Sequence, residues 1–482
     1  MNVITKTHVR FLYILTTLII FFTFPNLQGV CQAKDISSGV SFPDVQLASD
    51  DRILILAPHP DDEVLGCGGI IQKALALKLP VEVTFLTYGD NNEWSFLIYR
   101  KHPVIFSKSV QGMGLVRHNE AIEANKVLGL PSEQLVFLGY PNFGTLNIWY
   151  NHWNERPPFK SMLTKVKAVP YKNAFRPGAL YKGEEVLRDL TAILSEFRPT
   201  KIFLSHPADH NVDHRALYLF TNIAVWDLEM ESTVKLYPFL VHYKSWPQPR
   251  GHHPQEKLLP PDLYKREILW EISVLNSDEV IRKENALKKH HSQFETAASY
   301  LDAFIRENEL FGDFVKIKID ETISSSHSFS SRKAEFVSPP EELIDEERAS
   351  FVGIEEHSIS MENGNFIFSL RLSRRLAKEV GLSVYLFGYR QGVPFAKMPK
   401  IHVRFGAFLH AVYDQNKRIV LRNSGIRVTR QGRQITISIP LQLLGNPERI
   451  LTSANTYFGN IPLDWVSWRI IEISPIQTIK QQ

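Results

Sequence analysis

The chain has 482 residues, of which 44% are hydrophobic and 11% aromatic, so it is long and apolar enough for two or more packed domains. Lys and Arg number 55, Asp and Glu number 51, and the formal net charge is +4. With charges so nearly balanced, the composition gives no reason to expect a nucleic acid or an anionic membrane as the partner.

The N-terminus has the pattern of a targeting segment. A basic stretch over residues 6–10 precedes an apolar run, Phe11–Phe24, that is shorter than the ~20 residues a membrane-spanning helix needs. Cys31-Gln32-Ala33 supplies the small-x-small pattern of a cleavage site. We predict a signal peptide over residues 1–33 and export to the periplasm, the cell surface or the medium. An uncleaved membrane anchor is the alternative.

From about residue 50, short apolar runs alternate with longer amphipathic stretches, which is typical of βαβ units. This pattern predicts an α/β domain with a Rossmann-like, mostly parallel sheet and helices on both faces. The expected strands are Ile53–Ala57, Val81–Leu86 and Lys201–Ser205. The expected helices are Val64–Leu77, Arg117–Leu128, Glu184–Phe197 and Ser277–Asn308.

A cluster of ionisable residues, Ala57-Pro58-His59-Pro60-Asp61-Asp62-Glu63, directly follows the first expected strand. Loops at the carboxyl ends of parallel strands form the ligand crevice of open α/β sheets. Adjacent carboxylates repel one another unless a cation lies between them. Because His59 and Asp62 offer a nitrogen and an oxygen donor, the segment predicts a site for a divalent metal such as zinc.

A second cluster of His and Asp residues, over 206–215, follows the expected strand Lys201–Ser205. If this strand is parallel to Ile53–Ala57, both clusters emerge at the same edge of the sheet. His59 and Asp62 would then meet a donor from the second cluster at one metal ion. Three protein ligands leave one position for water, as in catalytic zinc sites.

The pattern changes over residues 319–349, where a Ser-rich stretch, a Pro-Pro pair and an acidic run indicate a linker. Strand-like runs separated by Gly, Asn and Pro turns follow it. They are Asn365–Leu372, Leu382–Tyr389, Ile401–Phe405, Arg418–Leu421 and Gln434–Ile439. We predict an accessory domain with an antiparallel β-sandwich over residues 350–482.

The first cluster resembles the Ala-His-Pro-Asp-Asp-Glu motif of the PIG-L/LmbE-like zinc-dependent N-acetylglucosaminyl deacetylases, and residues 206–215 resemble the Asp-His box of that family. Further similarities are Leu86–Asp90, Arg117 with Glu120, Leu138–Pro141, and Ser292-Gln293 ahead of Glu309–Phe311. The resemblance covers about residues 50–318. It implies a deacetylase domain there and does not extend to the C-terminal domain.

The resemblance implies roles for five residues. His59, Asp62 and His214 would bind zinc, Asp61 would be the general base, and Asp213 would orient the site. The chemistry agrees, since zinc lowers the pKa of a bound water to ≈7 and a nearby carboxylate can take its proton. Another divalent metal such as Fe2+ is the alternative.

One position departs from the family pattern. Members with the compact His-Pro-Asp-His box have a catalytic His three residues before the metal-binding His, and here Asn211 stands at that position. The group that stabilises the oxyanion is therefore open. Asn211 is a candidate as a neutral donor, and His206, His210 and His242 are candidates as cationic donors.

Several residues have two interpretations. Arg117 would bind a sugar phosphate or carboxylate, or else form a salt bridge with Glu120 or a neighbour. Glu63 is either part of the site or a carboxylate that stabilises the first turn of a helix. Five aromatic residues, three near residue 150 and two in the last domain, would either stack on sugar rings or pack within the protein, and packing within the protein is the favoured interpretation. These are Trp149, Tyr150, Trp153, Trp465 and Trp468.

The sequence therefore predicts an exported, metal-dependent hydrolase that removes acetyl from an N-acetylglucosamine-type glycan or conjugate, with zinc-activated water and Asp61 as general base. A metal hydrolase of another amide or ester is one alternative. An exported glycan-binding protein with a non-catalytic metal site is the other. The expected partner is an N-acetylated sugar, with no nucleic acid, and with membrane contact only through an uncleaved N-terminal segment.

Overall fold

The computed structural model describes residues 41–90, 107–320, 326–329, 337–339, 343–417, 419–421, 425–459 and 461–474. The predicted signal peptide over residues 1–33 lies outside the described residues, so export stays a prediction. Within the described ranges, no helix has the length and apolar character needed to cross a membrane.

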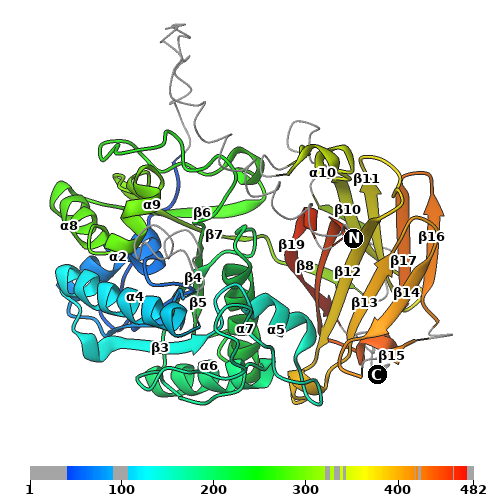
Figure 1. Ribbon diagram of the computed structural model, residues 1–482, viewed down its shortest axis with the longest axis horizontal. Coiled ribbons are helices and arrows are strands. Elements are labelled where there is room, and N and C mark those ends of the chain that lie inside the picture. The colour runs from blue at the N-terminus through cyan, green and yellow to red at the C-terminus, as the bar shows by residue number, and fades with distance from the viewer. Residues whose placement is uncertain are drawn as a thin grey trace, which may run out of the picture. The chain divides into compact units, whose positions relative to one another are not determined.

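The first domain is built on a seven-stranded sheet with the strand order β3-β2-β1-β4-β5-β7-β6 (Figure 1). The first five strands in this order are parallel, and β7 is antiparallel to both of its neighbours, β5 and β6. Every residue of β1 is buried, which explains why it is apolar throughout. The strands are β1 (Ile53–Ala57), β2 (Val81–Thr87), β3 (Leu135–Tyr140), β4 (Lys201–Ser205), β5 (Lys235–Phe239), β6 (Ile268–Val274) and β7 (Asn308–Phe314).

Helices lie on both sides of this sheet, as predicted. They are α2 (Asp62–Ala76), α4 (Ser107–Leu128), α5 (Thr145–Asn151), α6 (Gly183–Phe197), α7 (Val212–Asp227), α8 (Ser277–Leu287) and α9 (His291–Asp302). Helices α2, α4 and α8 pack against one another, and α6 packs against α7 on the other side of the sheet (Figure 1).

The single helix expected over Ser277–Asn308 is wrong. Helix α8 ends at Leu287, the backbone of α9 is non-helical at Ala297, and Asn308 begins β7. Apolar spacing continues across the break because both helices bury one face. The turn between them places the buried ring of His290 3.6 Å from Glu63, which a continuous helix would not do.

Helix α2 packs closely against its neighbours through glycine. A Cβ on Gly69 would lie 2.1 Å from Leu275 Cδ2, so a larger residue there would force the Leu275 side chain to move. The Gly69 N–H donates to Glu309 Oε1 (2.7 Å), and the same oxygen lies 2.7 Å from Lys283 Nζ. This buried ion pair fastens the helix that begins at the first cluster to β7 and α8.

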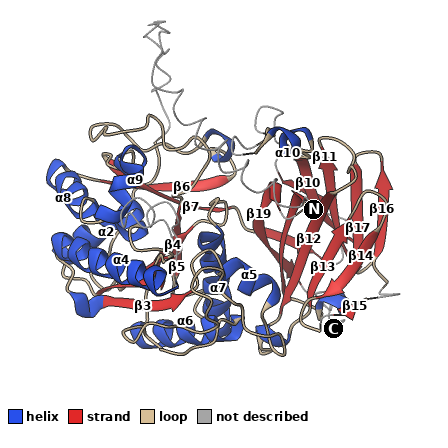
Figure 2. Ribbon diagram, viewed as in Figure 1, coloured by secondary structure: helices blue, strands red, loops and turns tan. Residues whose placement is uncertain are grey.

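The C-terminal region consists of two mostly antiparallel sheets with an apolar core between them, consistent with the predicted β-sandwich (Figure 2). One sheet has the order β16-β17-β11-β10-β9 and the other β15-β14-β13-β12-β18-β19-β8. The strands are β8 (Ile317–Asp320), β9 (Ser326–Phe329), β10 (Ile354–Glu362), β11 (Asn365–Leu372), β12 (Val380–Tyr389), β13 (Lys400–Phe405), β14 (His410–Asp414), β15 (Ile419–Val420), β16 (Arg427–Gln431), β17 (Gln434–Pro440), β18 (Arg449–Phe458) and β19 (Ile461–Ser474).

The range expected to be a linker, residues 319–349, contains β9, the end of β8 and a short helix, α10 (Asp345–Ala349). β8 pairs with β19 and β9 pairs with β10, so both strands belong to the C-terminal sheets. The domain boundaries at residues 318 and 350 stay predictions.

Aromatic side chains join α5 to the C-terminal sheets. Trp149 is completely buried, and its ring centroid lies 6.0 Å from that of Trp468 and 5.7 Å from that of Phe387. Tyr150 stacks on Tyr385 at 4.2 Å. Trp149 and Tyr150 of α5 therefore hold the two regions together, and Trp468 packs here rather than in the core between the two sheets.

Candidate metal centre

The two clusters of His and Asp residues follow neighbouring strands. β1 and β4 are parallel, with Ile53 opposite Lys201 and Leu56 opposite Leu204. The strand order reverses between them, because β2 lies beyond β1 and β5 lies beyond β4. Open α/β sheets bind ligands at such a reversal, outside the carboxyl ends of the strands. The structure thus places both loops at one edge of the sheet.

Four side chains converge at this edge. His59 comes from the loop after β1, Asp62 from the start of α2, His214 from the start of α7, and His242 from the segment after β5. One nitrogen or oxygen of each lies within 4.8 Å of the others. Asp62 Oδ2 lies 3.0 Å from both His59 Nδ1 and His214 Nε2. The three predicted ligands are therefore close together, and His242 joins them.

The surroundings of His214 fit a bound cation. Nε2 lies 3.0 Å from Asp62 Oδ2 and Nδ1 lies 3.1 Å from Asp209 Oδ2, but neither contact has the angles of a hydrogen bond. Burial lowers the pKa of His214, but the two carboxylates outweigh burial and raise the pKa to about 10. A positive charge is thus strongly favoured here. Two imidazoles and a carboxylate are donors that suit a divalent metal.

Asp209 connects the second loop to the segment that carries His242. Its Oδ2 accepts the N–H groups of Val241 (3.0 Å) and His242 (2.9 Å), in addition to facing His214. Burial raises the pKa of Asp209, but the charge of His214 outweighs burial and lowers the pKa to about 2. Asp209 therefore stays ionised and fixes the orientation of the His214 ring.

Asp213 holds His59 from outside the cluster. Its Oδ2 lies 3.2 Å from His59 Nε2 and accepts the N–H of Phe143 (2.5 Å). Its Oδ1 accepts the N–H (3.1 Å) and the hydroxyl (2.5 Å) of Thr145. The role of Asp213 as an orienting residue, which the family resemblance implied, agrees with these contacts.

Asp61 lies next to the cluster and is held in one position by Arg117. Its Oδ1 is 3.1 Å from Arg117 Nη2, and Arg117 also donates to the carbonyl oxygens of Pro60 (2.8 Å) and Gly89 (3.1 Å). Burial raises the pKa of Asp61 to about 6, against the opposing charge of Arg117. With φ of 146°, the Asp61 backbone adopts a conformation that L-residues rarely adopt, and such strain is common at functional sites.

Glu63 fastens the first loop to two helices. Its carboxylate accepts the N–H of Asp61 (2.9 Å) and the Nδ2–H of Asn125 on α4 (3.0 Å), and lies 3.6 Å from His290 Nε2. Burial lowers the pKa of His290, but Glu63 outweighs burial and raises it. Glu63 therefore supports the loop rather than only the first turn of α2.

Tyr300 determines which nitrogen of His242 carries the proton. The Tyr300 hydroxyl donates to the carbonyl oxygen of Val241 at 2.8 Å and lies 3.2 Å from His242 Nδ1. Because the hydroxyl proton is used, Nδ1–H must be the donor in the second contact. Nε2 of a neutral His242 then has a lone pair, which can accept a hydrogen bond or bind a metal.

Other predicted residues lie outside the cluster. The exposed ring of His210 packs against Trp465, with centroids 5.6 Å apart. Asn211 is the N-cap of α7, where its Oδ1 accepts the N–H of Asp213 (2.9 Å). His206 is completely buried behind the loop. Of the four oxyanion candidates, the structure brings only His242 to the metal ligands.

Some functional positions could not be identified from the sequence. Tyr300, His290 and Asn125 are distant along the chain and have no motif. Asp209 was visible in the second cluster, but only the fold shows that it faces His214. The cap position of Asn211 had a signal, because Asn directly before a helix commonly caps it.

Comparison with known proteins agrees with this geometry. Residues 54–225 match the PIG-L family, described as GlcNAc-PI de-N-acetylase. A glucosamine-6-phosphate deaminase-like protein of Bacteroides thetaiotaomicron is 25% identical over 288 residues, which are 51% of this chain and 36% of that protein. The chain therefore spans about a third of the length of this curated relative.

Two solved structures are similar to the chain over about half its length. The conserved protein TT1542 of Thermus thermophilus is 22% identical, with 53% of this chain and 84% of that one covered and a TM-score of 0.32. The N,N'-diacetylchitobiose deacetylase of Pyrococcus horikoshii is 19% identical, with 54% and 82% covered and a TM-score of 0.33. From the family match, residues 54–225 of this chain form a domain of the PIG-L family.

Proposed function

We propose that this protein is a zinc-dependent hydrolase that removes the acetyl group from an N-acetylated sugar, in an N-acetylglucosamine-type glycan or conjugate. The observation that carries the proposal is the meeting of His59, Asp62 and His214 beside the carboxylate of Asp61. The PIG-L family domain supports de-N-acetylation. Zinc is proposed because two imidazoles and one carboxylate are a common set of protein ligands in catalytic zinc sites, in which water takes the fourth position.

The chain's own residues account for the proton transfers of amide hydrolysis. A divalent metal held by His59, Asp62 and His214 would supply Lewis acidity, which acidifies water and polarises an acyl carbonyl. Asp61 takes the proton that the attacking water loses and returns it to the amine nitrogen as the C–N bond breaks. The products are acetic acid and the free amine, which at neutral pH become acetate and the protonated amine, so atoms and protons balance.

His242 and Arg117 have supporting roles in this proposal. Nε2 of His242 accepts a hydrogen bond from the attacking water or serves as a further ligand, because Tyr300 holds the proton on Nδ1. Arg117 fixes the Asp61 carboxylate and the Pro60 carbonyl. Since Arg117 is used in this way, we do not place it on a sugar phosphate.

The test combines metal analysis with acetate release. The full chain is purified, its metal content is measured, and acetate release is assayed with N-acetylglucosamine glycosides and a matched panel of other amides and esters. We expect one bound divalent metal, acetate release from the sugars, loss of activity on chelation, and recovery with Zn2+. Acetate release that persists without metal would overturn the mechanism.

The same assay separates the alternatives. Faster hydrolysis of simple esters or other amides would indicate a metal hydrolase of another class. Metal and glycan binding without any acetate release would indicate a glycan-binding protein. Export is a separate part of the proposal, and N-terminal sequencing of the mature protein from the producing cells tests it.

A further inference from the structure

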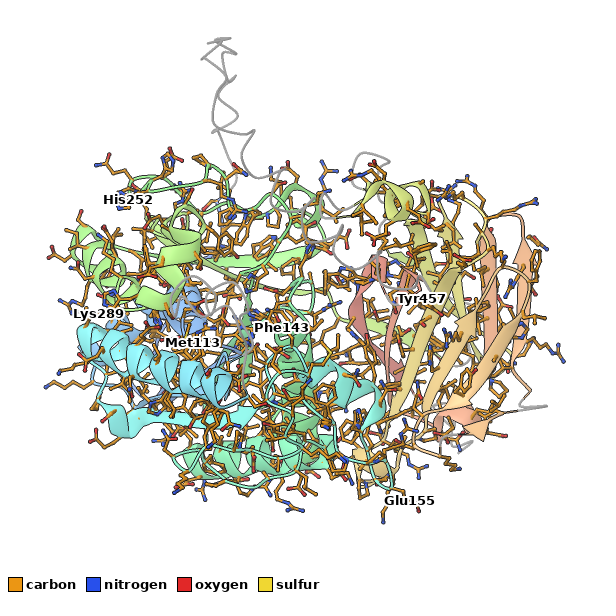
Figure 3. The ribbon with its side chains drawn as sticks, viewed as in Figure 1. Met113, Phe143, Glu155, His252, Lys289 and Tyr457 are labelled. Atoms are coloured by element: carbon orange, nitrogen blue, oxygen red, sulfur yellow. The ribbon has the colours of Figure 1, made fainter. Side chains whose placement is uncertain are left out.

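We propose that the side chain of Phe143 is the platform on which the sugar ring that carries the acetamido group packs. The inference rests on the proposed function and names a contact that determines its specificity. Phe143 lies in the turn between β3 and α5, at the edge of the sheet where the metal ligands meet. Figure 3 shows it with its side chain drawn.

The exposure of Phe143 is unusual for its position. The residue is 52% exposed, although its ring centroid lies 6.3 Å from that of the buried His59. A large apolar side chain next to a cluster of carboxylates and imidazoles does not contribute to a core. Its exposed ring is available to a molecule that enters the site.

The backbone of Phe143 has a conformation that glycine would adopt with less strain. Its φ is 57°, in the left-handed region that favours glycine. The turn itself needs only the backbone, since the Phe143 N–H donates to Asp213 Oδ2 and Thr145 provides the other contacts with this carboxylate. Glycine would make the same hydrogen bond without the strain. A strained and exposed aromatic residue beside the ligands therefore points to substrate contact.

A pyranose ring is the chemical group that fits this platform. Sugar rings present patches of C–H groups on their faces, and aromatic rings offer a flat apolar surface that packs against them. The acetamide must reach the metal ligands for hydrolysis. A platform next to His59 is thus close enough for the ring that bears the acetamide, rather than for a distant unit of a glycan.

The test uses Phe143→Gly, Phe143→Tyr and two substrates with the same acetamide, an N-acetylglucosamine glycoside and acyclic N-acetylethanolamine. We expect Phe143→Gly to raise KM for the glycoside about tenfold, the scale of one aromatic contact, and to lower kcat/KM for the acyclic amide much less. Phe143→Tyr should restore the KM. Metal content should not change, and the melting temperature should stay equal or rise because the strain is removed.

A matched control is Phe408→Gly, which removes a 90% exposed phenyl ring from the C-terminal region. Binding of the glycoside to inactive Asp61→Asn protein, with and without Phe143→Gly, gives a second measurement that needs no turnover. Equal losses with both substrates, or unchanged binding of the glycoside, would overturn the platform. Absence of acetate release from sugars by the unaltered protein would instead contradict the proposed function.

Discussion

The candidate metal centre is built from two segments, residues 57–63 after β1 and 206–215 after β4, called here the first and the second loop, and different parts of the molecule fix them. The loop after β1 is held within the α/β domain, where Arg117 contacts Asp61 and Asn125 contacts Glu63. Both partners lie on α4, which packs against α2 and α8. Among the described residues, the side chains that hold this loop belong to the α/β domain, so this domain supplies its support.

The loop after β4 depends also on the C-terminal region. The guanidinium of Arg215, next to His214, lies 4.0 Å from the centroid of the Trp465 ring on β19. Asp213 is bound by Thr145, the first residue of α5, and α5 packs through Trp149 on Trp468. The two loops meet at one site, and among the described residues it is the second loop that contacts the C-terminal sheets directly.

Residues of a family motif in the α/β domain can therefore be held in place by contacts with a different region of the chain, as the second loop is. In the proposed mechanism, the carboxylates of the first loop take part in the chemistry, and those of the second orient the ligands. The same substitution in each loop should therefore have different effects, and loss of a C-terminal contact should disturb only the second loop.

The largest effect is expected for Asp61→Asn. Removal of a general base lowers kcat by about 10² to 10⁴-fold, while the amide keeps the size of the side chain. Metal content should stay the same, since Asp61 is not among the proposed ligands. Steady-state acetate release and elemental analysis measure both quantities, with surface Asp262→Asn as the control. Activity within tenfold of the unaltered protein would remove Asp61 from the mechanism.

Asp213→Asn makes the same change in the second loop, where we expect a weaker and different effect. An amide cannot accept the contacts from Phe143 and Thr145 and also face His59 Nε2 with the same charge. Outer partners of metal ligands contribute about 10 to 100-fold in metal affinity. Metal titration with a competing chelator measures this loss. Unchanged affinity with a loss of kcat alone would mean that Asp213 acts in the chemistry instead.

The sequence predicted the parts of this site that depend on local pattern. Fully apolar β1 and the His-Asp clusters after β1 and β4 predicted a parallel sheet with a metal site at one edge, and the family resemblance implied which three residues would bind the metal. Which of His206, His210 and His242 faces the metal could not be predicted, because it depends on how the segment after β5 folds back onto Asp209. The break before α9 was missed because apolar residues keep their helical spacing across it. The spacing gives no sign of the turn that places His290 near Glu63.

Trp465→Ala tests the support from the C-terminal region. Loss of the ring over Arg215 should loosen residues 206–215 and weaken metal binding by about tenfold or less, the scale of one cation–π contact. Hydrogen exchange should rise in this loop and stay unchanged over residues 59–63. Tyr457→Ala is a suitable control, because Tyr457 packs on Arg404 in the same region rather than on a residue of either loop. Equal loosening of both loops would remove the distinction between them.

The smallest effect concerns how the stability of the folded protein falls with pH because of His206 in the second loop. Burial, assisted by the charge of Arg469 on β19, lowers the pKa of His206 to about 3. The unfolded chain, with a His pKa of about 6.5, therefore binds a proton that the folded chain does not bind. The folded state loses stability as the pH falls from about 6.5 toward 3.

His206→Asn should reduce this loss of stability. The Asn side-chain oxygen can replace Nδ1 as acceptor for the Ala208 N–H, and it does not titrate. Below pH 6, the slope of unfolding free energy against pH should become flatter by up to about 1.4 kcal/mol per pH unit, the value for one proton. Urea unfolding between about pH 4.5 and 7.5 measures the slope, since this range spans the unfolded His pKa. His252→Asn, at a half-exposed position, is the control and should change the slope less. Equal slopes for the unaltered protein and both variants would contradict the role of His206.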